Sequence, residues 1–146
     1  MAIKVVSGTI PFKSKGFDDI IDITVFVKEF VEKNKLLEGQ LLVFINGSTA
    51  AVSTIEYEPG LLQDLPAMLE KIAPMHQHYH HDETWHDGNG YAHLRSTLIG
   101  PSFTVPVTDG RLLLGTWQQI ILIDFDNSPR NRNVFLQFVG DVAEEE

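Results

Sequence analysis

All six histidines of the chain lie between positions 76 and 93, where they could bind a metal ion or exchange protons. Three acidic residues, Asp82, Glu83 and Asp87, are interleaved with them. Neutral imidazole is the commonest protein ligand of transition metals, and it is also the side chain that titrates near pH 7. We therefore expect the chemistry of the protein to be done in this segment.

The first three histidines, His76, His78 and His80, alternate along the chain. In an extended segment their side chains would point to one side, as a set of metal ligands requires. A solvent-exposed polar loop that is rich in histidine explains them equally simply. We favour the exposed loop for these three residues.

The later histidines are the better candidates, in the pairs His81-Asp82 and His86-Asp87 and at His93. A ligating histidine usually has its second ring nitrogen held by a carboxylate or a carbonyl, and this segment supplies carboxylates beside imidazoles. Neighbouring side chains on a strand point oppositely, so adjacency alone does not make a site. We expect a metal-binding or acid–base role for His81 and His93, with ordinary hydrogen-bonded loop histidines as the alternative.

Composition limits what such a site can belong to. The 146 residues suit one domain with its own core, predicted at 1–141, followed by an acidic tail at 142–146. There is no cysteine, so a metal site must use histidine and carboxylate ligands. The net charge of -9 argues against a nucleic-acid partner. The sequence shows neither a secretory signal nor a membrane-spanning run, and we expect a cytoplasmic protein.

Hydrophobic periodicity predicts an α+β domain with largely antiparallel sheets and two or three helices. Asn46-Gly47 predicts a hairpin between two adjacent strands, and Asp109-Gly110 predicts another. Pro74 ends the second helix, so the histidine segment is expected to begin as a loop. The predicted strands are 4–12, 41–45, 48–55, 98–107, 112–114, 119–125 and 134–139, and the predicted helices are 23–31 and 61–72.

Several polar residues outside the histidine segment are candidates for binding a ligand. Ser48 and Thr49 lie in a hydroxyl-rich turn that could cradle an anion, and Arg130 and Arg132 could clamp a phosphate, although turn hydroxyls and loop arginines are also common without a ligand. Asn89, between two glycines, could approach a ligand closely, or belong to a simple tight turn.

Three further residues are weaker candidates for a role in the site. Gln118 could aim its amide into a cleft from the start of an apolar strand. Glu56 and Asp64 flank the start of the second predicted helix, where acidic side chains usually serve the helix dipole.

Six motifs follow one another along the chain. They are Ser48-Thr-Ala-Ala51 followed by Glu56, Glu58-Pro-Gly-Leu-Leu-Gln-Asp64, Tyr79-His-His-Asp82, Asn89-Gly-Tyr-Ala-His93, Leu98-Ile-Gly100 with Val105-Pro106, and Gly110 with Leu114-Gly-Thr-Trp-Gln118. In this order and spacing they resemble the YjbQ-like family, also described as secondary thiamine-phosphate synthases, over nearly the whole chain. The resemblance implies a β-sandwich with helices, assembled as a homotrimer with its polar motifs at or near subunit boundaries.

The resemblance also implies which residues form the site. Many members of the family have a histidine just before the Ser-Thr-Ala-Ala run, where this chain has Gly47. We expect His86 to compensate, so that a divalent metal such as zinc would be bound by His81, His86 and His93. The family positions fall on Glu56, Asp64, His81, Asp82, Asn89, His93, Trp117 and Gln118.

The activity implied by the resemblance joins a hydroxymethylpyrimidine pyrophosphate to a thiazole phosphate, giving thiamine phosphate and pyrophosphate. Such a site needs groups that stabilise the departing pyrophosphate. Here Ser48, Thr49, Arg130 and Arg132 would bind the anionic small-molecule substrate, together with Asp64, Asn89 and Gln118. The catalytic candidates are His81, Asp82, His93 and Glu56.

Three functional classes follow from these residues. The first is a metal-assisted enzyme acting on an anionic small molecule. The second is a metal-free transferase or lyase in which His81 or His93 carries the proton, and chelators would leave it active. The third is a non-catalytic trimer that binds a metal or a small molecule without turnover.

Overall fold

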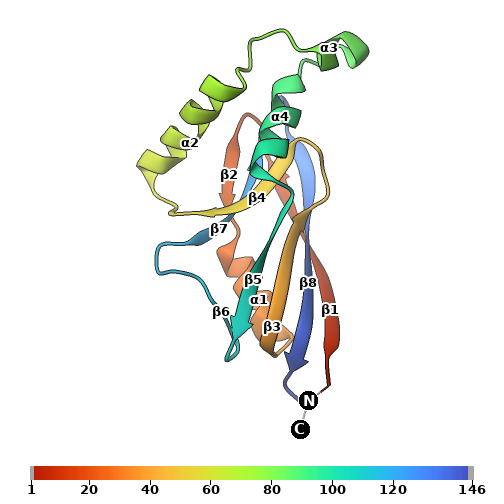
Figure 1. Cartoon of the computed structure of the whole chain (residues 1–146), viewed down its shortest axis with the longest axis vertical. Coiled ribbons are helices and arrows are strands. Elements are labelled where there is room, and N and C mark those ends of the chain that lie inside the picture. The colour runs from red at the N-terminus through yellow and green to blue at the C-terminus, as the bar shows by residue number, and fades with distance from the viewer. Residues whose placement is uncertain (1, 145–146) are drawn as a thin grey trace.

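The computed structural model describes residues 2–144 as eight strands and four helices (Figure 1). Residues 145 and 146 of the expected acidic tail lie outside this range. The elements are β1 (Lys4–Ser14), β2 (Asp19–Asp22), α1 (Thr24–Lys33), β3 (Leu36–Ile45), β4 (Ala50–Ile55), α2 (Pro59–Ile72), α3 (His80–Trp85), α4 (Gly90–Ile99), β5 (Ser102–Thr108), β6 (Arg111–Leu112), β7 (Gln119–Asp124) and β8 (Arg130–Val142).

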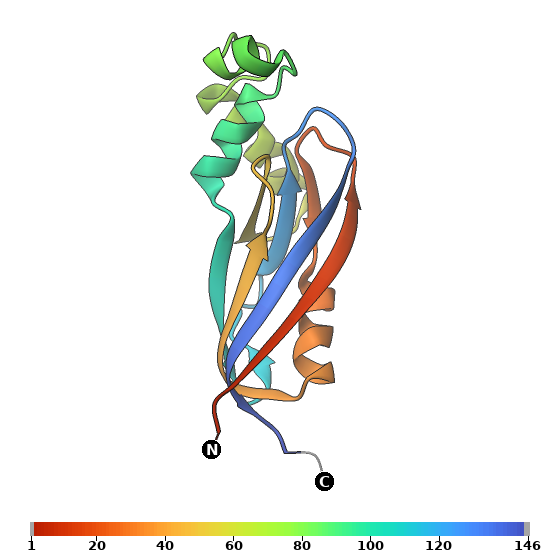
Figure 2. The same cartoon turned by 90° about the vertical axis from the view of Figure 1, so that its right-hand side faces the viewer.

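The strands form two sheets in which every pairing within residues 2–144 is antiparallel. The larger sheet has the order β1-β8-β3-β5-β6, and the smaller sheet has the order β2-β7-β4. The expected α+β class with antiparallel strands is therefore confirmed. In the view of Figure 2, the helices of the histidine segment gather at the end of the molecule that lies opposite both termini.

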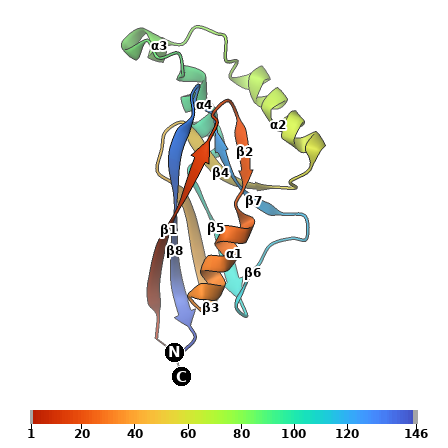
Figure 3. The ribbon, with the colours of Figure 1, turned by 180° about the vertical axis from the view of Figure 1, so that it is seen from behind.

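The core is divided by the smaller sheet. One cluster fills the space between the two sheets and α1, and it includes Ile120 and Leu122 of β7. A second cluster lies on the other face of the same strand, where Ile121 and Ile123 meet α2 and α4. Because both faces of β7 are covered, the strand is apolar at successive positions and not only at alternate ones. Figure 3, the view from the opposite side, shows α1 in front of β3 and β5 of the larger sheet, beside β6.

The predicted hairpin at Asn46-Gly47 is wrong. β3 belongs to the larger sheet and β4 to the smaller one, so the chain crosses between sheets at this turn. Both edges of β3 are already paired, with β5 on one side and β8 on the other, which leaves no edge for β4. By contrast, the predicted Asp109-Gly110 hairpin is confirmed, with φ angles of 53° and 73° between β5 and β6.

The number of helices was also underestimated, because the histidine segment contains α3 and α4. Residues 98 and 99, predicted as strand, are the end of α4, and β5 begins only at Ser102. The buried face of α4 carries Tyr91, Ala92, Arg95 and Ser96, and its leucines face outward. The apolar residues therefore do not mark the buried stripe from which a helix is usually recognised.

Arg95 fixes α4, and with it His93, to the rest of the molecule. Its side chain is 1% exposed and forms ion pairs with Asp18 and Glu70, each at 2.6 Å. Its Nε also donates to the carbonyl of Ala73 at 3.0 Å, and its Cζ lies 5.0 Å from the ring centroid of Tyr91. A buried charge with this many partners is costly to disturb.

Within the part of the chain that the structure covers, no helix combines the length and apolar composition that crossing a bilayer would require.

We expect Arg95→Leu to lower the free energy of unfolding by about 3–5 kcal/mol, because it leaves Asp18 uncompensated in a mostly buried position. Urea unfolding followed by circular dichroism measures this loss. Arg111→Leu, which removes an exposed arginine from β6, should cost less than about 0.5 kcal/mol. Equal losses for the two variants would show that Arg95 does not anchor the helix.

Candidate functional site

Two of the predicted histidines meet where α3 and α4 begin. His81 is the second residue of α3 and His93 the fourth of α4, and their ring centroids are 4.3 Å apart with the planes tilted by 44°. The backbone N–H of Gly90, in the first turn of α4, donates to Oδ1 of Asp82 at 3.1 Å. Asp82 therefore holds the start of α4 against α3 and keeps the two imidazoles in contact.

The inner nitrogen of His81 faces two carboxylates without forming a hydrogen bond. Nδ1 of His81 is buried and unpartnered, 3.6 Å from Oδ1 of Asp82 and 3.8 Å from Oδ1 of Asp87. These separations are too long for hydrogen bonds. They are close to the spacing of about 3.3–3.6 Å expected between neighbouring ligand atoms around a divalent ion bound at about 2.0–2.2 Å. The three side chains could therefore hold a metal ion with little movement.

His86 lies apart from this group. It ends α3 in the left-handed conformation, at φ 59°, and its side chain is exposed. The ligand atoms of His81, His86 and His93 do not all lie within 4.8 Å of one another, whereas those of His81, Asp82 and Asp87 do. The three-histidine arrangement expected from the sequence is thus not the one that the fold assembles most closely.

A polar cavity of about 280 Å³ lies beside His93. Four separate segments of the chain contribute to the cavity, which explains why no single sequence motif predicts it. Its lining contains both arginines and both hydroxyl residues that the sequence singled out as candidates for binding an anion. The lining residues are Gly47, Ser48, Thr49, Asn89, His93, Asp126, Arg130 and Arg132.

Arg132 forms the back of this cavity. Its guanidinium binds the fully buried Asp124 in a bidentate ion pair, with Nε at 2.7 Å and Nη2 at 2.9 Å from the two carboxylate oxygens. Nη2 also donates to Oγ1 of Thr49 at 2.7 Å. A Cβ atom at Gly47 would lie 2.7 Å from Nη1 of Arg132. The guanidinium therefore fills the space that a side chain at position 47 would need.

Asp126 organises the middle of the cavity and is 2% exposed. It accepts hydrogen bonds from Oγ1 of Thr49 at 2.9 Å, from Nδ2 of Asn89 at 3.3 Å and from Nε of Arg130 at 3.1 Å. Burial acts to raise the pKa of Asp126, but these bonds and the backbone N–H of Asn127 outweigh burial and hold the pKa below its ordinary value. Asp126 is therefore an ionised carboxylate that orients its neighbours.

The two arginines have different freedom to bind a ligand. The Arg132 side chain is 11% exposed and its charge is shared with Asp124, whereas the Arg130 side chain is 49% exposed. Within residues 2–144, the side chain of Arg130 donates to protein only through Nε. Its terminal N–H groups can therefore reach an anion in the cavity.

Asp124 and Asp126, which lie on either side of Phe125, were not among the residues predicted from the sequence. The available signal was two carboxylates directly after the apolar run Ile120–Ile123, a position in which a charge must be paired. Their partners Ser14 and Thr49 are distant in the sequence, so no local pattern could identify them.

Glu56, Asp64 and Gln118 are not brought to the histidines within one chain. Glu56 follows the far end of β4 from Thr49, and six strand residues span about 20 Å. Gln118 lies at the same far end, where its Nε2 donates to Oγ1 of Thr54 at 3.0 Å. Asp64 is exposed on α2.

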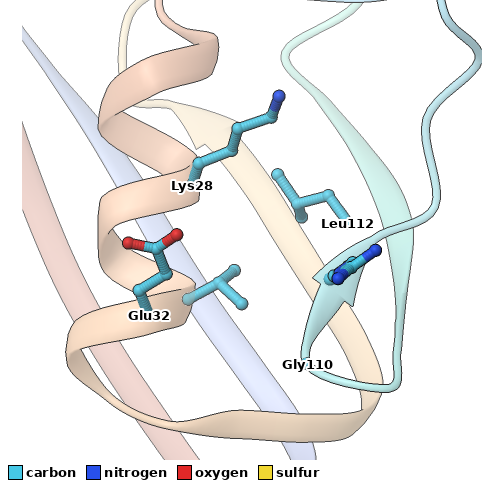
Figure 4. A pocket seen from close by; sticks show the side chains of 6 residues that line it. Lys28, Glu32, Gly110 and Leu112 are labelled. Atoms are coloured by element: carbon cyan, nitrogen blue, oxygen red, sulfur yellow. The ribbon is translucent and has the colours of Figure 1, made fainter.

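A second cavity, of about 260 Å³, separates α1 from the hairpin of β5 and β6 (Figure 4). Its walls combine the charges of Lys28, Glu32 and Arg111 with the apolar side chains of Val31 and Leu112. It contains none of the predicted site residues and lies far from α3 (Figure 1).

Burial and the neighbouring His81 imidazole lower the pKa of His93 below 6.5, against the opposing effect of three nearby carboxylates. In metal-free protein, we expect an NMR titration to show this depression, and His81→Ala to raise the pKa of His93. Because the folded pKa is the lower one, the unfolded chain binds the proton more tightly. The stability associated with neutral His93 is therefore present above the ordinary histidine pKa and is lost as the pH falls through the folded pKa. His76→Ala should leave the titration unchanged, and a His93 pKa at or above 6.5 would contradict this assignment.

Comparison with known proteins identifies the relatives of the chain. The sequence profile described as "UPF0047 protein YjbQ-like" matches residues 8–141. A UPF0047 protein of Archaeoglobus fulgidus is 43% identical over 82% of this chain and 90% of its own length, and one of Methanothermobacter thermautotrophicus is 37% identical over 94% of both chains. The crystal structure of a YbjQ-like protein of unknown function from Sulfolobus solfataricus aligns with a TM-score of 0.91 at 31% identity, covering 96% of this chain and 100% of the other. The chain therefore belongs to the YjbQ-like UPF0047 family.

Proposed function

We propose that the protein is a metal-assisted enzyme that acts on a phosphorylated or otherwise anionic small molecule. The observation that carries this proposal is the contact between His81 and His93. His81, with Asp82 and Asp87, forms a group of side chains suited to binding a divalent ion. His93 lines the cavity that contains the arginines. A substrate in the cavity would therefore lie next to the metal-binding group.

His81, Asp82 and Asp87 would hold the ion, for which zinc or a similar divalent metal suits a mixed nitrogen and oxygen ligand set. The ion would supply Lewis acidity toward an oxygen of the substrate. Arg130 and Ser48 would bind phosphate oxygens from the opposite side of the cavity. His93, whose lowered pKa keeps it neutral at pH 7, would accept or return a proton.

The condensation suggested by the family resemblance is our candidate reaction within this class. The bond between the hydroxymethyl carbon and pyrophosphate breaks as the thiazole nitrogen forms a bond to that carbon, and pyrophosphate leaves with the electron pair. The guanidinium of Arg130 supports this role, because the charge that develops on the leaving group is the charge it would stabilise.

A metal-free acid–base enzyme is the second candidate, and the lowered pKa of His93 favours it. In that case His93 would carry the proton, and His81 would tune it through their contact. Activity that survives exhaustive chelation would favour this candidate. A third possibility, a non-catalytic binding protein, would be supported by ligand binding without turnover of any phosphorylated heterocycle.

We also propose that the two-sheet sandwich is the subunit of a homotrimer. Three successive rows of outward residues across the larger sheet carry no charge, which supports self-association through this face. In such a trimer, a neighbouring subunit could bring Glu56, Asp64 or Gln118 to the cavity. A monomeric mass measured by light scattering would exclude the trimer. The rows are Val5, Val139, Gln40 and Pro106; Ser7, Gln137, Leu42 and Thr104; and Thr9, Phe135, Phe44 and Ser102.

Metal content distinguishes the two enzyme candidates directly. Protein purified without added metal or chelator, then dialysed extensively, should retain about one divalent ion per chain, and His81→Ala should lose it. His86→Ala should retain the ion, because His86 lies apart from His81, Asp82 and Asp87. Elemental analysis measures all three proteins. Loss of metal from both His81→Ala and His86→Ala would support the three-histidine ligand set, and absence of metal from the native chain would favour the acid–base enzyme.

Pyrophosphate binding tests the role of the cavity. Arg130→Gln should weaken binding about tenfold or more, because a charge-assisted hydrogen bond contributes about 1.5–3 kcal/mol. Arg111→Gln makes the same change of charge at the distant hairpin and should leave the affinity nearly unchanged. Isothermal titration calorimetry with pyrophosphate alone measures both, and equal weakening would indicate a general effect of net charge.

A further inference from the structure

The outer face of α3, with the residues just before it, carries a second group of potential metal ligands, separate from His81, Asp82 and Asp87. The group consists of His78, His80 and Glu83, whose ligand atoms all lie within 4.8 Å of one another. Nε2 of His78 is 2.9 Å from Oε1 of Glu83, and Nδ1 of His80 is 3.4 Å from Oε2. Hydrogen bonds from the two imidazoles lower the pKa of Glu83.

The backbone explains how these three side chains come together. Tyr79, between the two histidines, is extended at φ -124° and ψ 145°, and its hydroxyl points inward to donate to the carbonyl of Pro74 at 2.6 Å. Because side chains alternate along extended backbone, His78 and His80 both point outward. Glu83 follows His80 by three residues and so lies on the same face of α3.

We propose that His78, His80 and Glu83 form a solvent-facing binding site for a transition-metal ion. Around an ion bound at about 2.0–2.2 Å, tetrahedral ligand atoms are about 3.3–3.6 Å apart. The observed separations of 2.9 and 3.4 Å require only small side-chain rotations to reach that geometry. The alternation of histidines, for which sequence analysis favoured an exposed loop, would then serve as a ligand pattern.

The ligand set determines the class of ion. Two imidazoles and one carboxylate suit zinc, nickel or copper, whereas calcium and magnesium prefer oxygen ligands throughout. Three protein ligands also leave a coordination position for water. The exposed side chains, 67%, 97% and 58% for His78, His80 and Glu83, would allow rapid exchange of the ion with solution.

Binding at this site would stiffen the segment that carries the proposed active site. None of the six residues of α3 is buried, so the core holds this helix weakly. An ion shared between His78, before the helix, and Glu83, within it, would join the two. His81 follows His80 directly, so its position would become more fixed when the outer ion is bound.

The test is a zinc titration of metal-free protein in competition with a chromophoric chelator. Wild-type protein should bind two ions. In the His78→Ala/His80→Ala double variant, the affinity for one of these two ions should fall at least tenfold, so that only one ion remains bound at the same affinity as in wild type. His76→Ala, which removes a histidine of the same segment outside the group, should match wild type. Glu83→Gln should weaken the same site without changing the backbone.

The outer site and the proposed active site fail in different ways. If His81→Ala leaves zinc binding unchanged while the His78 and His80 variant loses an ion, only the inner assignment is wrong. If the His78 and His80 variant binds zinc as wild type does, the outer site is wrong. In His81→Ala protein, zinc should also slow amide hydrogen exchange in α3, and absence of that protection would contradict the stiffening. Circular dichroism confirms that each variant is folded.

Discussion

The bidentate ion pair between Arg132 and Asp124 is the interaction on which the candidate site depends. Asp124 is fully buried at the end of β7, and leaving its charge unpaired would cost several kcal/mol. The same pair connects β8 to β7, reaches β1 through the hydroxyl of Ser14, and reaches the crossing between the sheets through Thr49. The cavity is therefore a consequence of neutralising one buried carboxylate, and its shape is fixed by the fold.

The second requirement is the contact between two short helices. Arg95 holds α4 against the core, and Asp82 holds the first turn of α4 against α3, so the His81 and His93 rings meet. Asp82 is also one of the carboxylates near His81, which makes its structural and chemical roles inseparable. The proposed chemistry follows from this arrangement, because the contact between the two imidazoles places the His81, Asp82 and Asp87 group next to the cavity that contains the arginines.

Sequence patterns predicted most of the strands, because these carry alternating or continuous apolar residues that must be buried. They missed β2, and the strand predicted at 112–114 is the shorter β6, which ends at Leu112. They failed for α4, whose buried face includes Arg95 and whose leucines face solvent, and for the hairpin after β3, whose edges are taken by strands far away in sequence. The arginine and hydroxyl candidates Ser48, Thr49, Arg130 and Arg132 do gather around one cavity, as the sequence suggested. Asp126 and Asp124 were missed because a carboxylate can be predicted to be buried only when the residues that pair with it are known, and these partners are distant in the sequence.

We propose that His81, Asp82 and Asp87 bind a divalent ion beside the arginine cavity. X-ray diffraction from crystals grown with zinc, recorded on both sides of the zinc absorption edge, locates such an ion. We expect an anomalous peak between Nδ1 of His81 and the two carboxylates, at bonding distance from all three. An ion bound by His86 instead, or no peak at His81 in crystals that contain zinc elsewhere, would contradict it.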